Sequence, residues 1–128
     1  MTDLVPFVIW APRSFNSPPD HLCNAAMDEG ADWEWRNEPL LSQSFRSKAC
    51  FKICVDGGLR AKSGDKNSEQ KAAMGVAIYC KVLDGTNKTW NYVPVFFSAT
   101  RLWGVASAFH CEACALERAF DKVMRFCV

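Results

Sequence analysis

The sequence has no apolar run of the roughly 18 residues that a membrane span requires. Its start lacks the basic region of a secretory signal peptide and includes Asp3. It also contains no internal repeat and no low-complexity tract. These absences argue against a membrane protein and against a secreted one. We therefore expect an intracellular protein, cytoplasmic or nuclear, without a membrane partner.

A disulfide framework is missing as well. The seven cysteines are odd in number and scattered, whereas secreted disulfide-rich domains favour even, regularly spaced sets. Cys111 and Cys114 form a Cys-x-x-Cys next to His110, but a structural zinc site needs four ligands. A cysteine-based metal-binding protein is one functional hypothesis, and ordinary small residues on the polar side of a helix are the simpler interpretation.

The 128 residues, 49% of them hydrophobic, suffice for one domain with one core. Charge is distributed unevenly along the chain. Residues 1–50 hold seven acidic and four basic side chains, a net charge of −3, whereas residues 51–128 hold seven acidic and eleven basic ones, a net charge of +4. The second part is compatible with a polyanionic partner, although many proteins with such a surplus bind no nucleic acid.

The organisation of the chain changes near residue 48. The earlier part contains five of the six prolines, surrounded by Ser, Asn and Asp, which is typical of loops. A short helix is compatible with residues 19–30. We expect residues 1–48 to be an irregular flanking segment and residues 49–128 to form the domain.

Three strands are expected at the start of that domain. Residues 51–56 alternate between apolar and polar or small side chains, which predicts a strand that Gly57-Gly58 ends or bends. Residues 72–82 and 89–97 predict two more strands, joined by a hairpin turn at Asp84-Gly85. Because proline cannot donate to a ladder, Pro94 predicts that the third strand lies at the sheet edge.

A helix is expected from about Val105, with Ser107 as its N-cap. Apolar residues recur at spacings of three and four and predict a buried stripe: Val105, Phe109, Leu116, Ala119 and Val123. Glu112 falls within this predicted stripe, where a carboxylate needs a metal ion, a basic side chain or hydrogen-bond donors. A solvated helix start is the alternative for Glu112, and a turn-forming Asp-Gly is the alternative for Asp56.

The two carboxylates are more informative together than alone. A helix that follows a three-stranded meander must cover one face of the sheet, which can bring Glu112 to Asp56. Two adjacent carboxylates favour a hard divalent cation such as Mg²⁺ or Mn²⁺. Such ions activate water and stabilise charge on a phosphate, which is the chemistry of a metal-dependent nuclease.

The same residues carry a resemblance to a known family. Residues 51–58 are similar to the first strand of ribonuclease H domains of the plant and retroelement type, and Gly75 within residues 74–79 resembles the second strand. Residues 112–120 resemble the first helix of that family, with Ser107 where a serine or threonine often precedes it. The resemblance implies an α+β, ribonuclease H-like fold: a three-stranded antiparallel meander covered by a C-terminal amphipathic helix, lacking the later strands of the family. We therefore expect a C-terminally truncated, partial domain.

By this resemblance the chain hydrolyses the RNA strand of RNA–DNA hybrids. Asp56 and Glu112 would be catalytic and would hold Mg²⁺ or Mn²⁺, weakly because the further carboxylates of the family are missing. The expected nucleic-acid contacts are Gly57, Gly58, Arg60, Lys62 and Ser107.

The alternative is a non-catalytic remnant that binds protein or nucleic acid through the open edge of its first strand, an edge that a partner chain can cover. An aromatic set can stack on bases, although its place within a strand favours core packing. Its members are Trp90, Tyr92, Phe96, Phe97 and Trp103.

Overall fold

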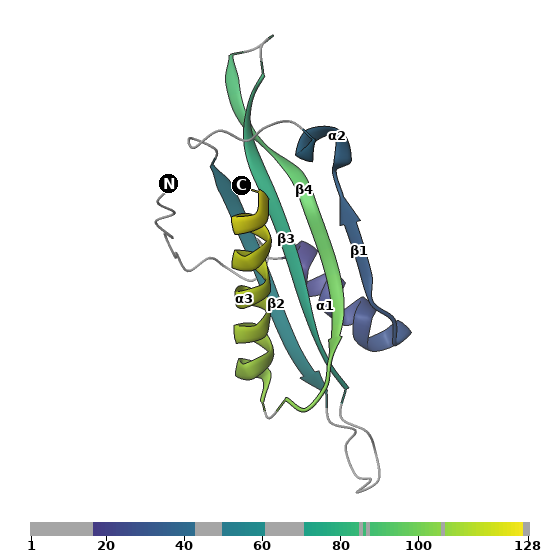
Figure 1. The fold of residues 1–128 in the computed structure, drawn as a ribbon. Helices are drawn as coiled ribbons and strands as arrows, with labels where there is room; N and C mark the ends of the chain where they lie inside the picture. Colours follow the sequence, from purple (N-terminus) through teal and green to yellow (C-terminus); the bar gives the residue numbers. More distant parts are fainter. Residues whose placement is uncertain are drawn as a thin grey trace, which may run out of the picture.

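The computed structural model describes residues 17–42, 50–60, 71–84, 86, 88–105 and 107–126. In chain order the elements are α1 (Ser17–Glu29), β1 (Trp33–Arg36), α2 (Glu38–Leu41), β2 (Phe51–Arg60), β3 (Lys71–Asp84), β4 (Thr89–Leu102) and α3 (Ala108–Phe126). The strands form one antiparallel sheet in the order β1-β4-β3-β2 (Figure 1). The protein is therefore α+β, and the predicted meander followed by a helix is present as β2, β3, β4 and α3.

Helix α3 packs on one face of the sheet, over β2 and β3 (Figure 1). Its start is capped as predicted, because Ser107 Oγ accepts a hydrogen bond from the backbone nitrogen of His110 at 3.1 Å. The core between α3 and the sheet consists of side chains of β3, β4 and α3 that exclude water almost completely: Met74, Val76, Ile78, Cys80, Val95, Phe96, Ala115, Ala119, Val123 and Phe126.

The buried stripe of α3 lies on a different arc from the predicted one. Phe109 is 78% exposed and Leu116 is 39% exposed, so neither belongs to the core. Glu112 is therefore an exposed residue beside the stripe, and Cys111 is buried instead of lying on the polar side. The buried residues of α3 are Cys111, Ala115, Ala119, Val123 and Phe126. Small side chains occupy the first three of these buried positions, where they let the helix approach the sheet closely.

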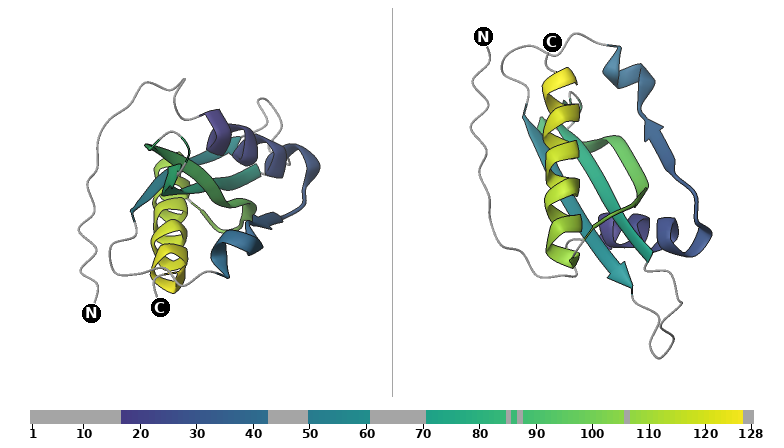
Figure 2. Two further views of the ribbon diagram at one scale, coloured as in Figure 1. Left: turned by 90° about the horizontal axis from the view of Figure 1, so that it is seen from above. Right: turned by 60° about the horizontal axis from the view of Figure 1, so that its bottom comes forward.

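Helix α1 covers part of the opposite face, so that the sheet lies between α1 and α3 (Figure 2). Cys23, Ala26 and Met27 recur at spacings of three and four and pack on Ala73 and Ala99. The short helix compatible with residues 19–30 is present as α1. The expectation that residues 1–48 form an irregular flanking segment is wrong for residues 17–42, which contribute two helices and an edge strand. The remaining residues of that segment lie outside the described part of the chain.

Strand β4 is not the edge strand that Pro94 predicted, because it lies between β1 and β3. The pairing of β1 with β4 runs only from Phe96 to Ala99, so β1 ends before it reaches Pro94. The β3–β4 register shifts between Ile78 and Tyr79, opposite this proline. Proline, which cannot donate a hydrogen bond to a neighbouring strand, is tolerated at a sheet edge or at an irregularity of the pairing, and Pro94 lies at such an irregularity.

Strand β2 forms the other edge of the sheet. It continues through Gly57-Gly58 to Arg60, so of the two expectations, that the glycines end the strand or bend it, the first is wrong. Within the described ranges, no strand pairs with its outer side. Binding of a partner through this edge, the alternative hypothesis, stays a prediction.

Candidate functional site

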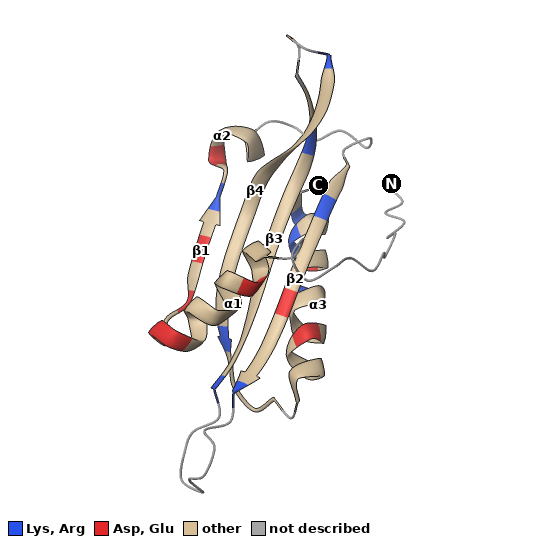
Figure 3. Ribbon diagram, turned by 180° about the vertical axis from the view of Figure 1, so that it is seen from behind, with Lys and Arg blue, Asp and Glu red and all other residues tan. Residues whose placement is uncertain are grey.

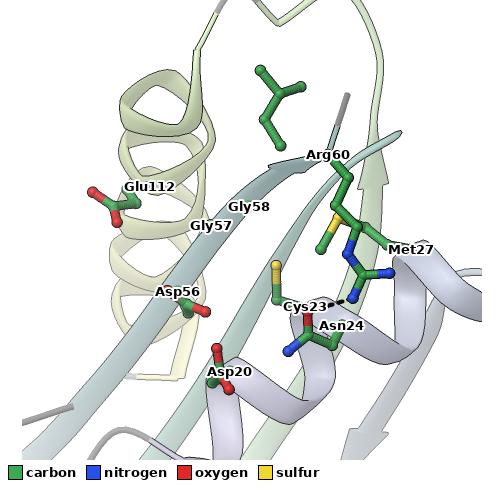
Figure 4. A pocket seen from close by; sticks show the side chains of 10 residues that line it. Asp20, Cys23, Asn24, Met27, Asp56, Gly57, Gly58, Arg60 and Glu112 are labelled. Carbon is green, nitrogen blue, oxygen red and sulfur yellow. Dashed lines mark hydrogen bonds between the residues drawn. The ribbon is translucent and has the colours of Figure 1, made fainter. Parts of the chain in front are cut away.

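A hollow of about 480 Å³ lies between α1, β2 and the start of α3 (Figure 4). Its lining comes from all three elements: Asp20, Cys23, Asn24, Met27, Asp56, Gly57, Gly58, Leu59, Arg60 and Glu112. Asp56 and Glu112, the two residues proposed from the sequence as a pair, therefore line the same hollow.

Gly57 explains why α3 begins on top of β2. A Cβ at this position would lie 2.3 Å from the backbone nitrogen of Glu112 and 2.4 Å from the carbonyl carbon of Cys111. Any side chain would collide with the helix backbone, so only glycine permits this approach. The contact places the first turns of α3 beside Asp56, the residue that precedes Gly57 in β2.

Gly75 plays the corresponding part for α1 on the other face. A Cβ here would lie 2.1 Å from the carbonyl oxygen of Pro19 and 2.9 Å from the backbone nitrogen of Cys23. Gly75 is also the cross-strand partner of Asp56 in the β2–β3 ladder, and directly opposed residues share a face of the sheet. The first turn of α1 therefore holds Asp20 next to Asp56.

The carboxyl groups of Asp20 and Asp56 point toward one another across the hollow (Figure 4). Burial raises the pKa of Asp56 to about 6, and the hydrogen bond with Asp20, the charge of Asp20 and the charge of Glu112 act in the same direction. The backbone N–H of Gly57 opposes them and lowers the pKa. Two carboxyls arranged in this way are stabilised by a shared proton or by a cation.

The other polar groups of the hollow are already engaged. At the rim, the Arg60 guanidinium donates to the Asp28 carboxylate and, at 2.8 Å, to Asn24 Oδ1. The Cys23 thiol donates to the Ala73 carbonyl at 3.4 Å, and burial, followed by the charge of Asp56, raises its pKa to about 12. Cys23 therefore stays a neutral thiol and is no nucleophile.

The donors fit a metal ion only in part. In the portion of the chain that is described, no group of three or more His, Cys, Asp and Glu side chains is arranged to hold one. Glu112 is exposed, and its carboxylate points away from Asp56 (Figure 4). Asp20 and Asp56 nevertheless present hard oxygen donors, and Mg²⁺ commonly takes one or two carboxylates and keeps several waters. This pair would therefore supply only part of a coordination shell, which water would have to complete.

The remaining predicted contacts fall at different places. Gly58 lines the hollow, where a Cβ would lie 3.0 Å from the methyl group of Met27 and 3.2 Å from Cys23 Sγ. Ser107 lies outside the lining and caps α3. Lys62 lies outside the described residues, so its expected nucleic-acid contact stays a prediction.

Asp20 is the site residue that sequence reasoning missed. Its only local signal is an acidic side chain in the first turn of a helix, which is ordinarily explained by the helix dipole. Its place beside Asp56 depends on the contact between α1 and Gly75, which joins distant parts of the chain. Local pattern cannot reveal a contact of this kind.

Comparisons of the chain with models of protein families, with curated protein sequences and with solved structures find no match. The chemistry of the hollow is therefore inferred from its own residues.

Among the helices that are described, none is both long enough and apolar enough to cross a membrane.

Proposed function

We propose that the chain is a ribonuclease H-like module that holds Mg²⁺ or Mn²⁺ and hydrolyses the RNA strand of RNA–DNA hybrids. One observation carries the proposal: Asp56 on the first strand of the meander and Glu112 at the start of the following helix line one hollow. The resemblance of the sequence implies this pair. The close approach at Gly57 supplies a physical reason for it, because no other residue type allows the helix to begin there.

Three carboxylates have distinct parts in this proposal. Asp56 and Asp20 face each other and supply the first oxygen ligands. Glu112 is exposed, so a change of side-chain rotamer can turn its carboxylate toward the hollow at little cost. When bound, the ion supplies an activated water and stabilises the charge that develops on a phosphate.

The surroundings of the hollow suit a phosphodiester substrate at one end. Arg60 lies at the rim with its side chain 45% exposed, held by Asp28 and Asn24. A phosphate in the hollow would compete with Asp28 for this guanidinium, since Arg binds phosphate and carboxylate in the same fork geometry. Arg60 therefore orients the substrate in this proposal, whereas the carboxylates hold the ion.

Hybrid cleavage in the presence of Mg²⁺ tests the proposal. We expect Asp56→Asn to lower the cleavage rate at least about 100-fold. The reason is that a metal ligand contributes several kcal/mol to transition-state stabilisation. Glu112→Gln and Asp20→Asn should also lower the rate. Glu117→Gln is the matched control, because Glu117 is exposed on the same helix and does not line the hollow. Equal rates for all of these proteins would overturn the proposal.

Metal binding gives a readout that does not depend on activity. Titration of the purified chain with Mn²⁺, followed by electron paramagnetic resonance, should show saturable binding that Asp56→Asn abolishes. The Glu117→Gln control should bind like the wild type. Saturable binding of equal strength to Asp56→Asn would contradict a site at this residue.

A further inference from the structure

Helix α1 leaves part of its face of the sheet uncovered (Figure 3). The cross-strand register places several large side chains on this part, because directly opposed residues share a face: Lys52 opposes Tyr79, Lys81 opposes Tyr92, Leu83 opposes Trp90, and Trp35 opposes Phe97. We call these residues the aromatic face. Helix α1 packs instead on Ala73 and Ala99, nearer the other end of the sheet.

The rings of the aromatic face are connected but not buried. Phe97 lies between Trp35, at a centroid distance of 5.3 Å, and Tyr79, at 5.9 Å with nearly perpendicular planes. Trp90 is 60% exposed, Tyr92 46% and Trp35 37%. Of the aromatic set that the sequence favoured as core, only Phe96 is fully buried. A patch of this kind marks an interaction surface more often than a random part of a monomer surface does.

The charged side chains described on the aromatic face are cationic. Lys52 Nζ lies 5.7 Å from the ring centroids of both Tyr79 and Tyr92, and Lys81 Nζ lies 5.6 Å from that of Trp90. The rings therefore hold the ammonium groups over the sheet. The acidic pair Asp20 and Asp56 lies apart, where α1 crosses β2.

We propose that the aromatic face binds single-stranded nucleic acid. Unpaired bases stack on Trp90, Tyr92 and Trp35, and Lys52 and Lys81 contact the phosphodiester backbone. The ligand class follows from two properties found together, exposed aromatic rings and cationic side chains beside them. A duplex fits less well because its bases are already stacked on each other.

A protein partner matches this surface less well than a nucleic acid does. The centre of a protein interface is depleted of lysine, whereas here two lysines lie among the rings. Phosphates would pair with these ammonium groups while the rings remain available for stacking on bases. The aromatic face and the carboxylate hollow are separate, so the proposal does not rest on hydrolysis.

Fluorescence anisotropy with labelled oligo-dT and oligo-U of about 12 nucleotides tests the proposal, since such lengths lie within known single-strand site sizes. EDTA excludes cleavage, and an RNA–DNA hybrid of equal length is the comparison. We expect both single strands to bind more tightly than the hybrid. Trp90→Leu should weaken binding at least about fivefold, the smallest effect of losing one stacking partner.

Trp103→Leu is the matched control, because Trp103 is 71% exposed but lies past the other end of β4. This variant should bind single strands like the wild type. Because both tryptophans are exposed, the thermal unfolding midpoints of both variants should equal that of the wild type. This measurement shows whether each variant is folded.

The lysines are tested through salt dependence. The double variant Lys52→Gln and Lys81→Gln should reduce the slope of log affinity against log salt by about 1.4, which is about 0.7 for each lost phosphate contact. Arg125→Gln on α3 should leave the slope unchanged, because Arg125 pairs with Asp121 on the opposite side of the molecule.

Three results would overturn the proposal. The first is no binding of either strand at low salt, and the second is equal binding of the hybrid and the single strands. The third is binding that the Trp90 and lysine variants leave intact. Because the probes are single strands in EDTA, each of these results is independent of hybrid cleavage, and loss of cleavage would not count against the aromatic face.

Discussion

Gly57 and the backbone nitrogen of Glu112 meet so closely that a Cβ on the glycine would lie 2.3 Å from that nitrogen. This contact determines where α3 begins relative to β2. It also brings the two carboxylates that flank it, Asp56 and Glu112, to one hollow. The packing of α3 on β2 and the position of the candidate site thus depend on the same close approach of two backbone segments.

Gly57→Ala should destabilise the protein by about 1–3 kcal/mol or more, because the methyl group meets backbone that cannot rotate away. Urea denaturation measures the change. Gly58→Ala is the matched control, since its Cβ would meet the ends of the Met27 and Cys23 side chains, which can shift. An equal or larger loss for Gly58→Ala would contradict this account of the α3 contact.

Gly75→Ala should loosen α1 selectively, because its Cβ would lie 2.1 Å from the Pro19 carbonyl oxygen. Hydrogen exchange should show that the α1 amides are less protected in the variant than in the wild type, whereas the protection of the α3 amides changes less. As Asp20 moves away, the pKa of Asp56 should fall toward its ordinary value, which NMR titration of the Asp56 side chain measures. Unchanged α1 protection would show that this helix does not depend on the glycine.

Asp56 should make stability fall as the pH rises from about 4 to 6. Its pKa is about 6 in the folded protein against 3.8 ordinarily, so the folded state binds the proton more tightly than the unfolded chain does. The resulting stabilisation is fully present below pH 4 and is lost as the pH passes 6. Asp56→Asn should therefore gain stability relative to the wild type over this range, in denaturation curves measured at several pH values. Asp121→Asn, on the exposed side of α3, should show no such gain.

Ser107→Ala should cost about 1 kcal/mol, because the first turn of α3 loses the acceptor for the His110 backbone N–H. Ser107→Asp should keep most of the stability, since its carboxylate caps the helix and suits the dipole. Thermal unfolding compares the three proteins. If both variants lose the same stability, the effect is not capping.

Local signals in the sequence predicted much of the sheet. The alternation in residues 51–56 and the β-branched and aromatic residues of 89–97 predicted β2 and β4, and Ser107 predicted the start of α3. The N-terminal elements were harder to predict, because the prolines around α1 mask its spacing of buried residues. Pro94 misled in a similar way, since the place where β1 ends is a tertiary property.

The orientation of α3 shows why the site was only half predicted. Its sequence offers two apolar arcs, one with Phe109 and Leu116 and one with Cys111 and Ala115. Hydrophobicity favours the larger residues, but the close contact at Gly57 admits only the smaller ones. Glu112 therefore reaches the hollow from the helix surface and not from within the buried stripe.

The sequence by itself determined the succession of three strands and a helix in the described part of residues 51–126, and it supplied the carboxylates of Asp56 and Glu112, because alternation, capping and residue type act locally. Only the tertiary structure decided which arc of α3 is buried, that Asp20 faces Asp56, and that Trp90 and Tyr92 stay exposed. The first two outcomes depend on how closely backbones approach at Gly57 and Gly75. Such contacts join residues far apart in the chain, so no local pattern contains them.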